Sequence, residues 1–540
     1  MMIRTKASYR LLYNNDTTNT AGVISPWHED GAPFREEMLI ASIEEVADKG
    51  VDAYMLSPGL GWVPWWQSKF GSAHYQWWKD RTGLEVKGWE GCGYDQYVYE
   101  GGDMVQVLID TCRKHNMAPF VSLRLNDVHL QENYAKKNQR SLVCCRFYAE
   151  HPEWHIDPNH YQWNGYNGSR GMNWAVPQVR QFKLGLLTEL AEKYDLAGIE
   201  LDFLRDNHLF RDGETDNAER IEIITEFVGE VRKALDAKPG ARRHLSVRIP
   251  LALSEHAGIG LDVARLREAG VDMFNLSGWY HTNQRTDIAR ARQLLPDAAI
   301  YQEMTHSNGN NRYFCDSGNY GTNGNPRTSD HQFYTTANLA LERGADGFSL
   351  FNFVYYRMGH TFDIPLMEPP FHVLPKLLDR AFLARQSQEY MLGETGYLGQ
   401  LPRQLHAGAC ETFQMDMALP PYSGLTPTTE APSENFMAEF VKTPIRLRVH
   451  TEQPLPSEDS LRASINGVPL QPTEDTTRFF ANPFDNMISP KQHRSAWVVP
   501  EGTLVNGLND IVIQLTTGDP LNVIYIDLGI TAPRKVFKED

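Results

Sequence analysis

Strand-like and helix-like segments alternate eight times over about 370 residues, and this alternation constrains the fold more than any other feature. The runs predicted as strands are Tyr9–Asp16, Val51–Ser57, Ala118–Leu125, the apolar run within Tyr194–Phe210, His244–Leu251, Val271–Ser277, Ala298–Met304 and Gly347–Tyr355. Eight βα units in series predict an α/β fold, the (β/α)8 TIM barrel. The connections that follow the strands are long and rich in Trp, His, Asn and Gly. Because these connections form the active face of a barrel, we expect chemistry there.

The pattern changes after about Arg385, where proline-rich stretches and short alternating strands begin. The predicted strands are Ile445–Val449, Leu461–Leu470, Leu508–Leu515 and Val523–Ile530. Short alternating strands without a helical stripe favour an all-β sandwich. We therefore predict two domains: a catalytic barrel over residues 1–382 and an accessory β-sandwich over residues 383–540.

The net charge of −16 argues against nucleic acid as a partner, because such a partner requires a basic patch. A local arginine cluster could still bind a small anionic substrate. No stretch approaches the ~18 apolar residues of a membrane span, so no membrane partner is expected. The sequence leaves a homo-oligomer open.

Six cysteines lack CxxC spacing, and two of them, Cys144 and Cys145, are adjacent. This usage favours free thiols and a reducing compartment. The N-terminal residues contain no long apolar core of a signal peptide. We therefore expect a cytoplasmic protein, although a processed secreted chain would look the same.

Two carboxylates alternate with apolar residues in the fourth predicted strand. Glu200 and Asp202 are two residues apart, so they share one face of the strand. Two acids on one face of a buried strand are costly unless they are paired or functional. Asp202 lies nearer the strand end and should reach the pocket, whereas we expect Glu200 one layer deeper, paired with Arg124 or Arg248. A purely structural ion-pair network is the alternative, and which acid acts is left open.

A third acid, Glu303, lies on the seventh predicted strand. Two carboxylates across a barrel mouth suit glycoside hydrolysis, because one protonates the leaving oxygen while the other attacks or activates water. We therefore predict Asp202, Glu303 and Glu200 as catalytic candidates. No metal or other cofactor is predicted, and the expected partner is a carbohydrate.

The substrate-binding candidates follow the predicted strands and carry hydrogen-bonding, charged or aromatic groups: Asn126, Asp127, His129, Arg205, Trp279 and Arg357. Asn and His suit sugar hydroxyls, and Asp127 could be a third catalytic carboxylate. Arg205 or Arg357 could hold the carboxylate or sulfate of an acidic sugar. Trp279 offers a stacking face for a sugar ring. The alternatives are purely structural roles: an Asx turn at Asp127 and structural ion pairs for the arginines.

The motifs GIELDF (198–203) and YQEM (301–304), followed by a β-sandwich, resemble the "glycosyl hydrolase-like 10" group of bacterial barrel proteins over residues 1–382. The resemblance implies hydrolysis of a glycosidic bond and a role in polysaccharide degradation. Two departures limit it. Retaining barrel glycosidases place Asn–Glu at the end of strand four, and chitinases place their acid where this chain has Leu204.

Two other function classes compete with the hydrolase. A metal-dependent lyase or epimerase could use Asp127, Asp202 and Glu255 as oxygen ligands. A non-catalytic sugar-binding barrel would retain the acids for hydrogen bonding. A histidine-rich segment (His151, His155, Asp157 and His160) matches no strong zinc motif, so we expect a loop without metal there.

Overall fold

The computed structural model describes residues 7–16, 19, 34–86, 93–129, 142, 144–157, 171–309, 325–357, 368–395, 398–421, 438–441, 444–457, 459–480, 493–532 and 534–537. The chain divides into two compact units. The first comprises Met1–Trp279, Asp287–Glu303 and Ala345–Arg357, and the second comprises Tyr280–Thr286, Met304–Gly344 and Met358–Asp540. The domain boundary between residues 382 and 383 stays a prediction.

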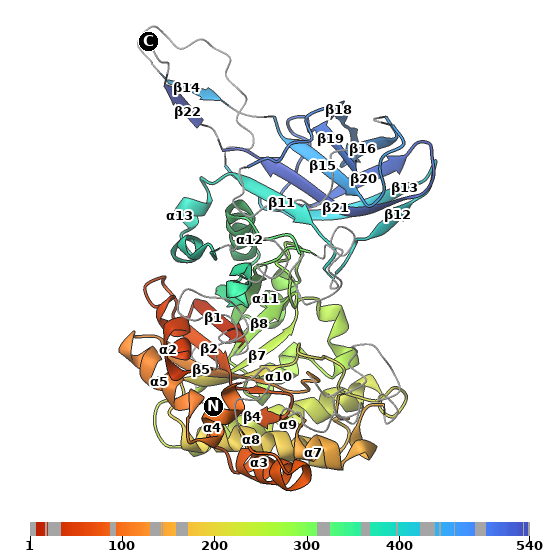
Figure 1. Ribbon diagram of the computed structural model, residues 1–540. Helices are drawn as coiled ribbons and strands as arrows, with labels where there is room; N and C mark the ends of the chain where they lie inside the picture. The colour runs from red at the N-terminus through yellow and green to blue at the C-terminus, as the bar shows by residue number, and fades with distance from the viewer. Residues whose placement is uncertain are drawn as a thin grey trace. The chain divides into compact units, whose positions relative to one another are not determined.

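Eight parallel strands close into a barrel in the order β1-β10-β9-β8-β7-β6-β5-β2, which confirms the predicted (β/α)8 fold (Figure 1). The strands are β1 (Leu11–Asp16), β2 (Ala53–Ser57), β5 (Ala118–Arg124), β6 (Gly198–Asp202), β7 (His244–Pro250), β8 (Met273–Ser277), β9 (Ala299–Thr305) and β10 (Gly347–Phe351). Each matches one of the eight predicted runs.

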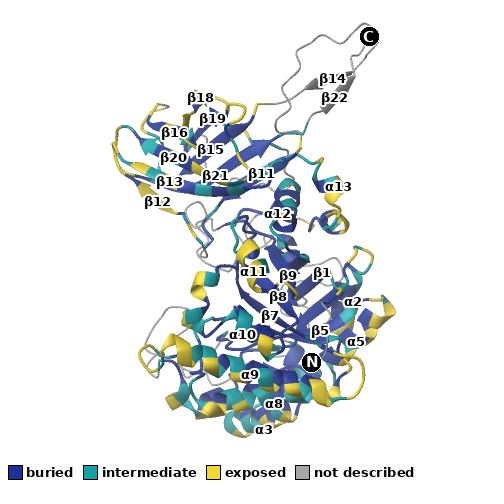
Figure 2. Cartoon of the chain, turned by 180° about the vertical axis from the view of Figure 1, so that it is seen from behind, coloured by how far each residue is buried: buried dark blue, intermediate teal, exposed yellow. Residues whose placement is uncertain are grey.

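Helices connect successive strands: α2 (Glu36–Glu44), α5 (Met104–Lys114), α8 (Pro177–Lys193), α9 (Asn217–Ala237), α10 (Val263–Ala269), α11 (Ile288–Leu294) and α12 (Asp330–Glu342). Helix α9 begins with a capping box in which Asp216 and Glu219 satisfy each other's backbone N–H groups. Helix α10 ends at Gly270, whose φ of 116° favours glycine. In Figure 2 the barrel strands are buried, while α8 and α9 also carry exposed positions.

The insertion after β2 has a core of its own. It contains β3 (Gly59–Leu60), β4 (Val63–Pro64), α3 (Lys69–Thr82) and α4 (Gly93–Tyr99). Trp62, Trp65, Trp66 and Trp78 are each no more than 2% exposed. Trp65 stacks on Tyr94 of α4 with the ring centroids 4.5 Å apart, whereas Trp62 lies 6.0 Å from Phe182 of α8.

The barrel interior changes character along its axis. Near the N-terminal ends of the strands it is apolar, with a cluster that includes Leu12, Phe120 and Met273. Because inward side chains recur at every second position, the next inward positions along the strands are polar, and the last carry charges. The charged end coincides with the carboxyl ends of the strands, where barrel enzymes have their active sites.

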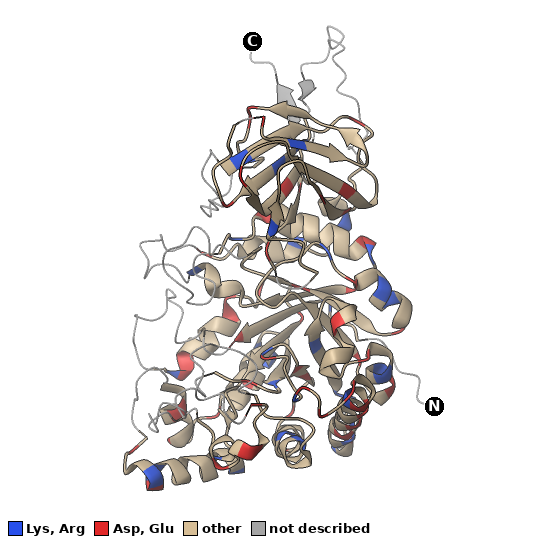
Figure 3. Cartoon of the chain, turned by 90° about the vertical axis from the view of Figure 1, so that its right-hand side faces the viewer, with Lys and Arg blue, Asp and Glu red and all other residues tan. Residues whose placement is uncertain are grey.

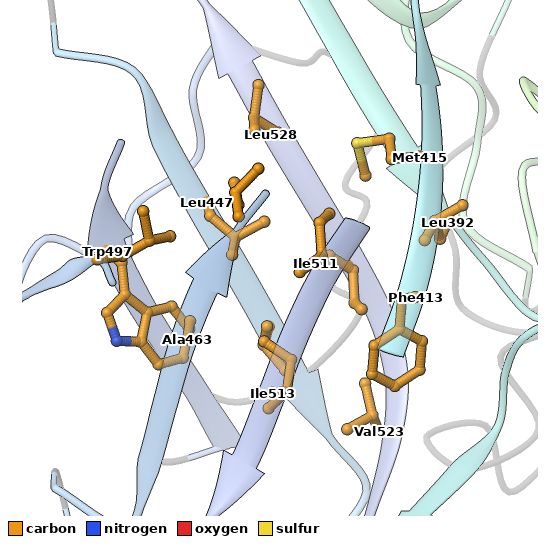
Figure 4. Packing of buried hydrophobic residues seen from close by; sticks show 14 of the residues in the cluster. Leu392, Phe413, Met415, Leu447, Ala463, Trp497, Ile511, Ile513, Val523 and Leu528 are labelled. Carbon is orange, nitrogen blue, oxygen red and sulfur yellow. The ribbon is translucent and has the colours of Figure 1, made fainter. Parts of the chain in front are cut away.

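The second unit contains a β-sandwich, as predicted. One sheet has the order β11-β21-β15-β19-β18 with β12 attached to β21, and the other has the order β13-β20-β16-β17. The bounds are β11 (Gln388–Leu392), β12 (Arg403–Leu405), β13 (Cys410–Met417), β15 (Arg446–Thr451), β16 (Leu461–Ile465), β17 (Val468–Pro469), β18 (Gln471–Thr473), β19 (Arg494–Val498), β20 (Gly507–Leu515) and β21 (Leu521–Ile530). Alternate residues of both sheets, such as Leu447, Ile513 and Leu528, meet in one buried cluster (Figure 4).

A separate pair of strands, β14 (Ala438–Val441) and β22 (Arg534–Phe537), runs antiparallel. In the view of Figure 3, acidic and basic segments are interspersed along the helices. Ion pairs within one helix, such as Arg232 with Asp236, account for part of this pattern. In the described part of the chain, no helix has the length and apolarity needed to span a bilayer.

Gly198, at the start of β6, has no room for a side chain. A Cβ there would lie 2.2 Å from Phe120 Cε1 and 2.6 Å from His244 O. We expect Gly198→Ala to lower the free energy of unfolding by about 1–3 kcal/mol through overpacking. Urea denaturation followed by tryptophan fluorescence reports on this unit, because 11 of the 12 tryptophans precede residue 280.

Gly229, inside α9, provides the matched control because a Cβ there meets nothing within 4 Å. Gly229→Ala should stabilise the protein by about 0.5–1 kcal/mol, since alanine has the better helix propensity. Equal effects of the two substitutions would contradict this account of the strand.

Candidate active site

Glu200 lies in the polar middle layer of the barrel and is fully buried. Asn14 Nδ2 and Ser122 Oγ donate to Oε1 at 2.6 and 2.8 Å, and Ser246 Oγ donates to Oε2 at 3.1 Å. Burial, together with the nearby charge of Asp202, raises the pKa of Glu200 to about 7. Glu200 therefore gains a proton more readily than an ordinary glutamate.

The hydrogen bonds to Glu200 come from Asn14, Ser122 and Ser246, so the prediction that it pairs with Arg124 or Arg248 is wrong. Each arginine lies one inward position further along its strand and binds acids of the layer above. Small serines beside Glu200 supply neutral donors instead. These contacts place the side chains of Arg124 and Arg248 inside the barrel.

Arg248 joins Asp202 to Glu303 at the charged end of the barrel. Its Nε and Nη2 donate to the two oxygens of Glu303, both at 2.7 Å. Its Nη1 donates to Asp202 at 3.2 Å (Oδ1) and 3.3 Å (Oδ2). The guanidinium also lies 3.9 Å from the ring centroid of Phe351. Although burial alone would lower it, the charges of Glu303 and Asp202 raise the pKa of Arg248, so the bridge is ionic.

Glu303 is surrounded by donors. Besides Arg248, Asn275 Nδ2 donates to Oε2 at 3.0 Å and Ser277 Oγ donates to Oε1 at 2.5 Å. Its side chain has no exposed surface. Four hydrogen bonds on its two oxygens fix the orientation of the carboxyl group. This environment suits a group that holds Arg248 in place.

Asp202 occupies the last position of β6, as predicted. Its Oδ1 accepts the backbone N–H groups of Leu204 at 2.8 Å and Arg205 at 3.3 Å. Its side chain is 4% exposed, compared with none for Glu303. Of the two acids on β6, Asp202 is thus the one at the charged end of the barrel.

A second ionic chain begins at Arg124 on β5. Arg124 pairs with Asp16 at 2.5 Å and with Asp127 at 3.0 Å. Asp127 Oδ1 accepts the backbone N–H of His129 at 3.0 Å and contacts His129 Nδ1, while Arg205 contacts His129 Nε2. The structure therefore brings together Asp127, His129 and Arg205 from the predicted set.

Asp206 is a site residue that sequence reasoning missed. It is 4% exposed, and its Oδ2 accepts the backbone N–H of Val128 at 3.0 Å. Its φ of 67° is uncommon for a residue other than glycine. The one available signal was its position directly after Arg205, in the loop that follows the fourth strand.

The other three predicted residues have different surroundings. Asn126 uses its amide to bind backbone atoms of Met172 and His208, so it ties two loops together. Trp279 is half-buried, with its backbone held by Ser277 and Arg248. Their roles in substrate binding stay predictions.

Arg357 pairs with Glu45 at 3.0 Å, with the side chains 3% and 11% exposed. This buried ion pair matches the structural alternative for Arg357. The carboxylate of Glu45 therefore already binds the guanidinium that was predicted to bind an anionic sugar.

One group of ligand-type side chains within the described residues is close enough to hold a cation: Asp127, His129 and Asp206, whose ligand atoms lie within 4.8 Å of one another. This group differs from the predicted alternative of Asp127, Asp202 and Glu255. Asp127 already accepts donors on both oxygens, including the N–H of Gly61 at 3.2 Å. Because the charge of Arg205 also lies against His129, the group as arranged suits a cation poorly.

In the histidine-rich segment, His155 bonds the carbonyl of Tyr148 at 3.0 Å, and His151 pairs with Glu153 at 3.1 Å. His160 lies outside the described residues. Among the described cysteines, Cys112, Cys144, Cys145 and Cys410 are free thiols.

No protein-family model and no curated protein matches the chain. Similar solved structures include alpha-L-fucosidase isoenzyme 2 from Paenibacillus thiaminolyticus, at 13% identity and a TM-score of 0.42, over 71% of this chain and 51% of that one. The maltogenic alpha-amylase AmyB from Thermotoga neapolitana is 12% identical with a TM-score of 0.35, over 95% of this chain and 98% of that one. A mutant Streptomyces plicatus beta-hexosaminidase is 9% identical with a TM-score of 0.37, over 64% of this chain and 58% of that one. These neighbours are glycoside hydrolases, and the chain spans about half the length of the fucosidase. The barrel assignment follows from the strand order itself, and membership of the glycosyl hydrolase-like 10 group stays a prediction.

The raised pKa of Glu200 predicts a specific pH dependence of stability. Its folded value of about 7 lies above the ordinary 4.5. Its contribution is therefore fully present below about pH 4.5 and is lost as the pH rises towards 7. Glu200→Gln carries no such titration, so the unfolding free energy of the wild type should fall relative to this variant over that window.

Urea titrations of both proteins at several pH values measure the difference. Glu192→Gln, at an exposed position of α8, is the control and should differ from the wild type by an amount nearly independent of pH. A pH-independent difference for Glu200→Gln would contradict the assignment of a near-neutral acid to the barrel interior.

Proposed function

We propose that this protein is a glycoside hydrolase in which Asp202 is the carboxylate that attacks the anomeric carbon or activates water. The observation that carries the proposal is the placement of Asp202: it ends the fourth barrel strand, with Arg248 and two backbone N–H groups on its oxygens. Such donors hold a carboxyl group in one orientation, as a nucleophile or general base requires. Barrel enzymes use residues at this end of the strands.

The charge balance at this end supports a reaction that develops positive charge. The acids named here are five (Asp16, Asp127, Asp202, Asp206 and Glu303), and the arginines are three (Arg124, Arg205 and Arg248). A surplus of carboxylates stabilises the oxocarbenium-like transition state of glycoside cleavage. The same surplus opposes an anionic substrate.

We therefore propose a neutral sugar as the substrate in preference to the acidic or sulfated one. Arg205 contacts His129, and Arg357 pairs with Glu45, so both arginines considered for an anionic group have other contacts. Glycosides of acidic sugars are therefore tested beside the neutral ones.

Glu303, predicted as the second catalytic carboxylate, fits a positioning role better. Its two oxygens already accept four hydrogen bonds from Arg248, Asn275 and Ser277, and its side chain has no exposed surface to meet a leaving group. Because Glu303 binds Nε and Nη2 of Arg248, the remaining nitrogen, Nη1, is directed towards Asp202. A metal-dependent lyase is the competing reaction class, and undiminished turnover after exhaustive EDTA treatment would exclude it.

The test is hydrolysis of a panel of neutral, uronic and sulfated aryl glycosides. We expect turnover of at least one neutral glycoside, and a loss of at least ~100-fold in kcat for Asp202→Asn with little change in melting temperature. Asp195→Asn, an exposed acid that precedes the same strand, should keep full activity. Wild-type activity in Asp202→Asn, or turnover confined to anionic sugars, would contradict the proposal.

Glu303→Gln separates the positioning role from the catalytic one. The substitution places an amide against Arg248 and leaves that buried charge underpaired, so we expect a loss of about 3 kcal/mol in unfolding free energy together with lower activity. Loss of activity without loss of stability would favour Glu303 as a catalytic group.

A further inference from the structure

A small pocket in the second unit is lined by two loops that follow barrel strands and by one loop of the sandwich. Residues 282–285 follow β8, Asn308 follows β9, and Gly393, Thr395 and Gln400 lie in the connection from β11 to β12. All of them belong to the second compact unit. Because barrel enzymes bind their substrates with the loops that follow the strands, two of the three walls are of the kind that contacts ligands.

The walls of this pocket are fixed to one another by close contacts. Gln284 Oε1 accepts the backbone N–H of Met391 at 2.7 Å, and Gln284 Nε2 donates to Glu389 O at 3.0 Å. Gly393 packs so closely that a Cβ there would lie 2.4 Å from Asn308 O. Walls that are held in this way need little ordering when a ligand binds, and this favours affinity.

Arg285 is the one charged residue among the described residues that line the pocket. It is half-buried, and its single hydrogen bond runs from Nη2 to Gln414 Oε1 at 3.2 Å. It forms no ion pair with a carboxylate in the part of the chain that the structure describes. A guanidinium carries several further N–H donors, so most of those of Arg285 are left for water or for a ligand.

Other arginines of the second unit show the usual pairing with acids. Arg343 binds Asp416 at 2.5 Å, and Arg448 binds Asp527. Compared with these ion pairs, the charge of Arg285 is not neutralised by the protein. A planar guanidinium in this state matches the geometry of a carboxylate, which it can bind with two parallel hydrogen bonds.

Asn308 provides a second group without a partner. It is 1% exposed, and its Nδ2 donates to Gln332 Oε1 at 2.7 Å. Its Oδ1 accepts no hydrogen bond from the described residues. A buried acceptor without a donor is costly, and native structures usually supply one. The pocket therefore offers a cation for an anion and an acceptor for a hydroxyl group.

We propose that this pocket binds a sugar acid, with the carboxylate on Arg285 and a neighbouring hydroxyl group on Asn308. Sugar acids carry both groups on nearby carbon atoms, whereas a neutral sugar lacks the anion and a simple carboxylic acid lacks the hydroxyl. The volume of the pocket is about 20 Å³, more than the smallest cavity that holds a water molecule. The polar head of the ligand therefore enters, and the rest stays outside.

The ligand is a free sugar acid or an acidic unit of a longer glycan. The charged end of the barrel has a surplus of carboxylates, whereas the charge that lines this pocket is positive. A neutral sugar at the barrel site and an acidic one in the pocket are therefore compatible. Binding in the pocket needs no hydrolysis, so it does not depend on the proposed function.

Calorimetric titration of the intact protein at constant ionic strength tests the proposal. The probes are glucuronate, galacturonate, mannuronate and gluconate, each beside the corresponding neutral sugar. At least one sugar acid should bind, and Arg285→Gln should weaken that binding by at least ~10-fold while any binding of the neutral sugar is unchanged. Arg462→Gln, at an exposed position of β16, is the matched control and should bind as the wild type.

Equal affinity of the wild type and Arg285→Gln for every sugar acid, or no binding of any of them, would overturn the proposal. Acetate that binds as tightly as the best sugar acid would also overturn it, because acetate has no hydroxyl group for Asn308. Tighter binding of an oligosaccharide that contains the acid would identify a glycan as the source, and equal binding would identify the free acid.

If Arg285→Gln does not fold, a crystal of the wild type soaked with the tightest sugar acid decides instead. A carboxylate within hydrogen-bonding distance of Arg285 would support the proposal, and a ligand bound elsewhere would overturn it. A wild type that binds a sugar acid through Arg285 but hydrolyses no glycoside would overturn the glycosidase proposal alone.

Discussion

The ion bridge through Arg248 determines what the end of this barrel can do. One guanidinium neutralises Glu303 with two hydrogen bonds and reaches Asp202 with its remaining nitrogen, all in a region with almost no exposed surface. Removing one member of such a pair leaves a buried charge and costs about 3–5 kcal/mol. The three residues lie on β6, β7 and β9, so the bridge also links strands that local propensity alone would not hold in register.

The same constraint explains why two acids on one strand behave differently. Glu200 and Asp202 share a face of β6, but Glu200 receives neutral donors and Asp202 receives an arginine. Burial, together with the nearby charge of Asp202, raises the pKa of Glu200 to about 7, because its neutral donors do not offset these effects. The barrel interior therefore changes from apolar, through polar, to rich in acids and arginines at the carboxyl ends of its strands, where barrel enzymes have their active sites.

The fold could be predicted from the sequence to a large extent, because a barrel repeats one local pattern. Strand positions, the inward direction of Arg124 and Arg248, and the place of Asp202 at a strand end all follow from periodicity. The site could be predicted only in part. The hydrogen bond from Asn14 to Glu200 joins residues 186 positions apart, and the pairing of Arg357 with Glu45 spans 312. Periodicity contains no information on such partners.

Asp206 shows the second limit of prediction. Its place beside Asp127, which comes from a different loop, accompanies a left-handed backbone conformation with a φ of 67°. Neither a tight turn at a non-glycine residue nor a contact between two loops leaves a periodic trace in the sequence. Glu303 is the converse case: its strand position was predictable, but the four donors to its carboxyl group come from three other side chains.

The central claim is that Asp202 is the reactive carboxylate of a glycosidase, and covalent labelling tests it most directly. Cyclitol epoxides of several sugar configurations require an acid to open the ring and a carboxylate to attack it. Peptide mass mapping after inactivation should place the label on Asp202, with protection by the competing sugar. A label on Glu303, or no inactivation by any configuration in a protein that hydrolyses glycosides, would contradict the account.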